Sequence, residues 1–298
     1  MDNGMTSILP APSMIGPRVR RIAALLLVLC AGGLAAQEAP SGADPPLPPA
    51  GQPSPPPATK WEGALGVSMS VSQEYQGAAR TKISARPAFF IRHGRFVVSS
   101  GGGFVTRRRD DVFRGLGVDV VQHDRLRMNV SLRLDHGRRS SSSDALAGIE
   151  DVRRTIRARS SATWQLDHGW KLAAGWNFDL LGRGGGHIID LGIGHDRRLS
   201  PRTTWSVGSG LVWADRRNTQ SYYGVTPEES QASGYAVYMP GSGLRGVSLS
   251  TGWRMEINPD WTAYWGGSIG KLLGPATDSP FTDAARSWSL NGGIARRF

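Results

Sequence analysis

The segment LRMNVSLRL, residues 126–134, decides the fold class. Its even positions hold Leu126, Met128, Val130, Leu132 and Leu134, and its odd positions hold Arg127, Asn129, Ser131 and Arg133. Successive side chains of a β-strand point to opposite faces, whereas a helix would spread both sets around its circumference. The segment therefore predicts a strand with one apolar face and one polar, charged face.

The same alternation recurs from Trp61 onward in about twelve segments, among them residues 61–71, 170–180 and 247–256, and no long window has the apolar spacing of a helix. These runs extend over about nine to thirteen residues, whereas strands of soluble proteins average about five or six. A tilted strand needs about nine to eleven residues to cross a bilayer. Strand length therefore favours a membrane barrel over a soluble sandwich.

The connections between these segments alternate between short and long. The tight ones are residues 93–94, 123–124, 167–169, 195–201 and 258–260. The longer ones are residues 73–79, 107–111, 137–151, 182–186, 215–243 and 274–284. Outer-membrane barrels have short periplasmic turns and longer outer loops. The pattern predicts an all-β fold, a transmembrane antiparallel β-barrel of about twelve strands.

The chain ends in ARSWSLNGGIARRF, residues 285–298, which alternates in the same way. Because an open strand edge in hydrocarbon leaves backbone groups without partners, we expect the N-terminal and C-terminal strands to pair and close the barrel. Phe298 then falls at the periplasmic interface. A terminal phenylalanine resembles the assembly signal of outer-membrane proteins, so the barrel-assembly machinery is an expected partner.

The tryptophans gather near the ends of the predicted strands. Those assigned to the periplasmic ends are Trp61, Trp164, Trp170, Trp205, Trp253 and Trp261. Aromatic side chains are enriched at membrane–water interfaces, whereas core packing in a soluble domain predicts no clustering by strand end. We interpret these six residues as an aromatic belt in contact with outer-membrane lipid.

The first 60 residues have a different composition. Arginines at positions 18, 20 and 21 precede a short apolar run and the small residues Gly33 to Ala36, which is the pattern of a signal peptide over residues 1–36. Residues 37–60 are rich in proline and predict an extended periplasmic linker. Residues 61–298 are then the outer-membrane barrel, and cleavage near Ala36 would remove the only cysteine, Cys30.

Basic residues account for the formal net charge of +11. Those on predicted inner faces are Arg80, Lys82, Arg86, Arg127, Arg133, Arg157, Arg159 and Lys171. Two interpretations remain open: ion pairs with Glu62, Asp119, Asp135, Asp179 and Glu256, or a path for anions. Nucleic acid is a poor partner for an exported chain with this distribution. Residues 107–109 and 138–139 are arginines near outer loops, facing either lipopolysaccharide phosphates or solvent.

Known catalytic patterns of membrane barrels are not assembled by this sequence. Four of the six histidines, His93, His123, His168 and His195, fall in or beside predicted periplasmic turns, away from the inner-face aspartates. No Ser/His pair or matched acid and histidine pair is predicted at one strand end. We therefore expect a non-enzymatic protein without a metal or cofactor.

The segment YYGVTPEESQASG, residues 222–234, begins with Tyr222, Tyr223, Gly224 and Val225. Together with LLGPATDSPFT, residues 272–282, and the terminal strand, it resembles the MipA/OmpV family of outer-membrane proteins. The resemblance implies a twelve-stranded barrel without catalytic residues. It also implies a role as a scaffold for murein-remodelling enzymes at the cell envelope. The alternatives are a small anion-preferring channel and a surface adhesin that acts through residues 215–243.

Overall fold

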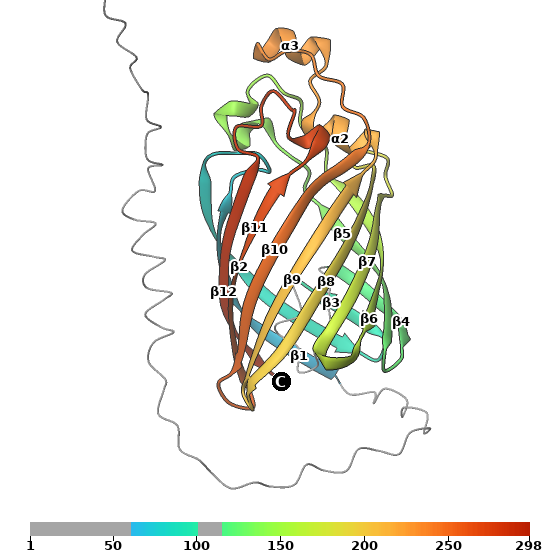
Figure 1. The fold of residues 1–298 in the computed structure, drawn as a ribbon, viewed down its shortest axis with the longest axis vertical. Helices are drawn as coiled ribbons and strands as arrows, with labels where there is room; N and C mark the ends of the chain where they lie inside the picture. The colour runs from blue at the N-terminus through green and yellow to red at the C-terminus, as the bar shows by residue number, and fades with distance from the viewer. Residues whose placement is uncertain (1–60, 101–114) are drawn as a thin grey trace, which may run out of the picture. The chain divides into compact units, whose positions relative to one another are not determined.

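Twelve antiparallel strands form a closed barrel, which confirms the predicted fold class (Figure 1). The computed structural model describes residues 61–100 and 115–298. The predicted signal peptide (residues 1–36), the predicted linker (37–60) and the predicted loop at 107–111 lie outside the described residues. Each strand pairs with its neighbour in sequence, and β12 pairs with β1.

The strands are β1 (Trp61–Gln73), β2 (Thr81–His93), β3 (Phe96–Ser99), β4 (Gly115–Gln122), β5 (Leu126–Asp135), β6 (Thr155–Gln165), β7 (Trp170–Asp179), β8 (His187–Ser200), β9 (Thr203–Ala214), β10 (Gly243–Glu256), β11 (Trp261–Leu272) and β12 (Arg286–Arg297). The short helical elements are η2 (Ser140–Ser142), η3 (Asp144–Leu146), η4 (Asp167–Gly169), α2 (Arg216–Tyr223), α3 (Pro227–Ser233) and η5 (Gly274–Ala276).

Side-chain burial alternates along β5, which contains the segment at residues 126–134. Val130 is 45% exposed while its neighbour Ser131 is 4% exposed. The apolar side chains therefore point outward, where lipid covers them, and the polar ones point into the barrel. This is the sidedness of a membrane barrel.

The connection predicted at residues 195–201 is much shorter in the structure. β8 continues to Ser200 and β9 begins at Thr203, with Asp196 opposite Ser206 and Arg198 opposite Thr204. The charged end of β8 has the composition of a turn, but its backbone hydrogen bonds continue in the ladder. Polar residues are tolerated there because the strand end has left the hydrocarbon region.

The seam between β1 and β12 is paired from Ala64, opposite Arg297, to Ser72, opposite Ser289. Beyond β12, the backbone N–H of Phe298 donates to the Gly63 carbonyl at 2.9 Å, and the Gly63 N–H donates to the Phe298 carbonyl at 3.1 Å. The chain terminus thus completes the ladder, and no edge remains at this seam.

The connections at the end of the barrel opposite the chain terminus carry α2 and α3 (Figure 1). The Asp215 side chain caps α2 by accepting from the Asn218 N–H at 2.8 Å. Thr226 and Glu229 form a reciprocal capping box at the start of α3, and Gly234 ends that helix with a left-handed φ of 79°. None of the helices in the described ranges is long and apolar enough to cross a membrane.

Candidate functional site

The lumen wall contributed by β2 and by β4 to β8 is charged and internally paired. Arg159 binds Asp190 through two hydrogen bonds of 2.6 and 2.7 Å. Lys171 lies 3.5 Å from Asp196, and Arg92 lies 3.4 Å from Asp119. The inner cations Arg159 and Lys171 are thus in ion pairs, but with Asp190 and Asp196, which are not among the predicted acidic partners. Arg297 on β12 makes a further pair with Glu256 at 3.6 Å.

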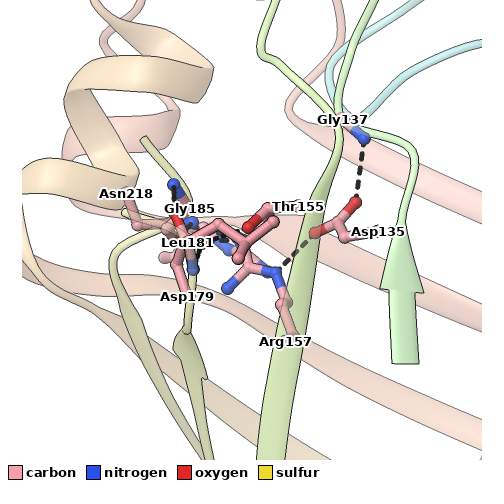
Figure 2. Close-up of polar contacts among 9 residues, drawn as sticks. Asp135, Gly137, Thr155, Arg157, Asp179, Leu181, Gly185 and Asn218 are labelled. Atoms are coloured by element: carbon pink, nitrogen blue, oxygen red, sulfur yellow. Dashed lines mark hydrogen bonds and ion pairs between the residues drawn. The ribbon is translucent and has the colours of Figure 1, made fainter. Parts of the chain in front are cut away.

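Arg157 is the largest fully buried side chain among the described residues and lies near the outer end of this wall (Figure 2). Its Nε donates to Asp135 at 2.5 Å, and one terminal nitrogen donates to the Gly185 carbonyl at 2.9 Å. Asp179, directly opposite on β7, accepts from Thr155 and from the Gly185 N–H. The cluster therefore links β5, β6 and β7 to the loop before β8.

The other basic residues predicted to face inward have different environments. Arg133 lies opposite Arg157, and Arg127 lies opposite Thr163, so both share the inner face. Arg86 and Lys82 are exposed on β2, opposite Ser68 and Ser72. The expectation for Arg80 needs correction, because it precedes β2 in the connection from β1. It is exposed there and pairs with Asp144 at 3.1 Å.

The middle of the opposite lumen wall is made of small uncharged residues, whereas Arg254, Glu256 and Tyr264 lie on the same face nearer the periplasmic end. Its inward positions are Ser206, Gly208 and Gly210 on β9, Ser248, Ser250 and Gly252 on β10, and Gly266, Ser268 and Gly270 on β11. Ser248 and Ser250 are exposed, whereas Ser131 and Thr163 on the charged wall are buried. The free space of the lumen therefore lies along β9 to β11.

The predicted family loop forms part of a cap of packed outer connections. Tyr223 is 1% exposed, its hydroxyl donates to Gln76 Oε1 at 2.8 Å, and its carbonyl accepts from Ser279 at 2.7 Å. Val225 is fully buried in an apolar cluster with Leu146, Ile149 and Phe281. We use the term cap for the connections at residues 74–80, 136–154, 215–242 and 273–285, which these contacts join. Gly224 is buried between the two anchors.

Burial changes the acid–base properties of the cap. It raises the pKa of Tyr75 to about 12, with a further contribution from the charge of Asp283. Burial likewise raises the pKa values of Tyr222 and Tyr223, and it lowers the pKa of the Arg138 guanidinium. These pKa shifts arise because the side chains are shielded from bulk water, as expected for a packed cap.

A cavity of about 500 Å³ lies between the cap and the barrel end. It is lined by Glu74, Tyr75, Gln76, Lys82, His136, Gly137, Arg138, Arg139, Ser142, Tyr222 and Tyr223. Arg138 is 8% exposed and donates to the carbonyls of Tyr222 at 2.9 Å and Glu150 at 3.2 Å. The cavity therefore brings together three separate connections of the chain.

The predicted belt residues lie on the outward faces of their strands. Trp61, Trp164, Trp170 and Trp261 are exposed. Trp205 and Trp253 are half-buried because they lie opposite each other, and Trp205 donates to Thr251 at 2.8 Å. Phe298 is 68% exposed at the same end of the barrel as Trp61. Its ring lies over Gly63, where an added Cβ would come within 2.3 Å of it.

Sequence reasoning missed Arg92, Arg138 and Asn218. Arg92 follows the alternation of β2 and could have been found by extending the count of inner positions to the strand end. The prediction that Arg138 faces lipopolysaccharide phosphates or solvent is wrong, because its side chain is 8% exposed, and no periodic signal indicates this burial. Asn218 is fully buried on α2 and donates to the Gly185 carbonyl at 2.8 Å. Only the tertiary structure identifies that contact.

The MltA-interacting protein MipA family model matches residues 65–298, which is the barrel almost from its first strand to its last residue. The chain belongs to this family. Together with the closed barrel and its apolar outer surface, membership places the protein in the outer membrane. The Tyr222 to Val225 element and the terminal strand both lie within the matched residues.

Two curated relatives are named MltA-interacting protein, one from Escherichia coli and one from Shigella flexneri. Each is 25% identical over 168 residues, which is 54% of this chain and 63% of the relative. The match thus spans less than two thirds of the relatives' own length. Among solved structures, an outer membrane channel from Pseudomonas putida is 11% identical with a TM-score of 0.40, covering 83% of this chain and all of the other. A loop-deletion mutant of OmpT from Vibrio cholerae is 8% identical with a TM-score of 0.37, covering 80% and 98%.

Proposed function

We propose that this barrel is a non-enzymatic scaffold that holds murein-remodelling enzymes at the periplasmic side of the outer membrane. The family description and the names of the two relatives support a protein partner. The catalytic groups of known barrel enzymes are not brought together in the described part of the chain: its ionised residues form structural pairs such as Arg159 with Asp190.

The observation that carries this proposal is the charge of the periplasmic rim. We define the rim as the exposed arginines at the short-turn end of the barrel: Arg95, Arg125, Arg197, Arg198, Arg202 and Arg296. Exposed carboxylates at that end are Asp124, Asp167 and Asp260, and Asp167 is already paired with Arg125 at 3.2 Å. A positive rim suits a partner with an acidic surface, because complementary charge speeds encounter and fixes orientation.

The test compares the rim variant Arg197→Gln/Arg198→Gln/Arg202→Gln with a control at the cap. The control Arg153→Gln/Arg154→Gln/Arg216→Gln removes the same charge from exposed residues of outer connections. Tagged proteins are purified from envelopes in mild detergent, and co-purifying murein-degrading activity is measured as soluble fragments released from purified sacculi. We expect at least a tenfold loss for the rim variant and none for the control.

Deletion of residues 39–59 tests the contribution of the linker in the same assay. If the deletion removes the co-purifying murein-degrading activity and the rim variant does not, the docking site lies in the linker and not at the rim. If neither change reduces the co-purifying activity, or if the full chain captures none, the scaffold proposal fails.

A small channel is a second candidate, which the solvated wall of β9 to β11 favours. Ser248 and Ser250 are exposed although they face inward, so water reaches them. On the opposite wall the ion pairs of Arg159 and Lys171 reduce the charge left for anion selection. Single-channel recording in planar bilayers decides this question, because a barrel closed by its cap passes no resolvable current.

A further inference from the structure

The cavity beneath the cap has a surplus of positive charge. Lys82, Arg138 and Arg139 line it together with His136, and Glu74 is the acidic residue in its lining. The carboxylates that interact electrostatically with the two arginines are already engaged. Glu229 accepts from the backbone of Glu150 and Thr226 at 2.8 Å each, and Asp151 accepts from the Ser140 N–H at 2.7 Å. Lys82 donates to the Glu74 carbonyl at 2.8 Å and Arg138 donates to two other carbonyls, so neutral groups hold these two cations and their charge is left for an anionic ligand.

Two buried polar atoms of the lining have no hydrogen-bond partner among the described residues. They are Nε of Arg138, a donor, and Oε2 of Glu74, an acceptor. A buried polar atom without a partner costs free energy, and such atoms are a small minority in folded proteins. Arg138 is more than nine-tenths buried and is held in place by its bonds to the Tyr222 and Glu150 carbonyls. Both of its terminal nitrogens are taken up by these bonds and its Nε has almost no accessible surface, so Arg138 contributes fixed positive charge to the cavity wall.

We propose that this cavity binds a small sugar that carries a phosphate or carboxylate group. The anionic group contacts Lys82 and Arg139, the buried charge of Arg138 adds to the positive potential behind them, and a sugar hydroxyl donates to Glu74. A volume of about 500 Å³ accommodates a sugar of one or two rings and lies within the range of known ligand pockets. The tyrosines Tyr75 and Tyr222 supply aromatic surface of the kind that such pockets present to the apolar faces of ligands. The site lies at the end of the barrel opposite the periplasmic rim, so this proposal stands apart from the scaffold function.

Isothermal titration calorimetry on the detergent-solubilised barrel tests the proposal with glucose 6-phosphate, and with glucose as the neutral comparison. We expect saturable binding of glucose 6-phosphate only. The variants Lys82→Gln and Arg139→Gln should each weaken binding at least tenfold. Arg153→Gln removes the same charge from the same connection outside the cavity lining and should leave binding within twofold of the full chain.

Competition distinguishes two sources of the ligand. Displacement of glucose 6-phosphate by lipopolysaccharide micelles assigns the site to a lipid headgroup, and lack of displacement assigns it to a free sugar phosphate. If Arg153→Gln weakened glucose 6-phosphate binding as much as Lys82→Gln and Arg139→Gln do, the effect would reflect the overall positive charge of this end and not the cavity. That result would overturn the proposal. So would the absence of binding to wild-type protein whose heat-modifiable gel mobility shows that it is folded.

Discussion

At the scale of single residues, the stability of the charged lumen depends on hydrogen bonds and ion pairs that offset the cost of burying each charge. Arg157 is 1% exposed, and burial of a guanidinium is costly unless carboxylates and carbonyls surround it. Asp135 and the Gly185 carbonyl accept from two of its three guanidinium nitrogens (Figure 2). Asn218 of α2 donates to the same carbonyl, so one buried arginine joins the barrel wall to the cap.

Substitution Arg157→Gln should destabilise the barrel by about 3–5 kcal/mol, because it leaves the Asp135 carboxylate without its buried partner. The measurement is the urea midpoint of folding into lipid vesicles. Arg125→Gln is the matched control, since its pair with Asp167 is exposed on both sides and water replaces the lost contact. Equal midpoints for the two variants would contradict the structural role of Arg157.

At the scale of elements, the seam between β1 and β12 requires small residues. An added Cβ at Gly66 would lie 2.1 Å from the Ile294 carbonyl oxygen and 2.6 Å from the Ala295 Cα, both backbone atoms. Close approach of two strands at this point therefore depends on glycine.

We expect Gly66→Ala to lower the yield of closed barrel by separating β1 from β12. Gly192→Ala on β8 is the control, because its added Cβ would meet only the Ser209 carbonyl oxygen at an ordinary 3.4 Å. Heat-modifiable gel mobility after refolding reports the closed fraction. A Gly66→Ala protein that closes as well as the control would mean that the seam adapts without cost.

The cap should respond to alkaline pH. The pKa of Tyr75 is raised above its ordinary value of 10.0 to about 12, so the folded cap favours the neutral phenol. The stabilisation is complete below pH 10 and is lost as the pH rises toward 12. We expect protease cleavage within residues 136–154 to accelerate over this interval, and we expect Tyr75→Phe to remove part of the pH dependence. Cleavage that is independent of pH would show that ionisation of Tyr75 does not open the cap.

The extent to which sequence predicts this structure differs between strands and cap. The period of two predicts the sidedness of β5 residue by residue, because a strand has only two faces. Arg80 was misplaced because alternation was extended past the first residue of β2 into a connection. The sequence places Arg138 near an outer loop but predicts neither its burial nor the contacts of Asn218, because their partners are carbonyls of distant loops and carbonyls leave no signal in the sequence.

At the scale of the whole molecule, the two ends of the barrel differ in kind. The outer end is covered by connections that pack around Val225 and Phe281, while the periplasmic end consists of short turns with exposed arginines. The barrel separates these two ends. The proposed ligand site beneath the cap and the proposed docking rim therefore lie on opposite sides of one membrane. The last residue lies at the docking end.

Removal of Phe298 separates stability from assembly. In the folded barrel its backbone exchanges two hydrogen bonds with Gly63, and its ring is 68% exposed to the membrane interface. An aromatic side chain contributes about 1.5–3 kcal/mol at full burial, so a ring this exposed contributes less, and a closed barrel should survive its loss. If Phe298 is also the assembly signal that the sequence predicts, its recognition precedes closure and depends on the free terminal strand. We therefore expect the chain ending at Arg297 to refold in detergent nearly as well as the full chain but to reach the surface of cells at least tenfold less. Comparable surface levels for the two chains would make Phe298 an interface anchor alone, whereas a matching loss in detergent would make it a structural part of the seam.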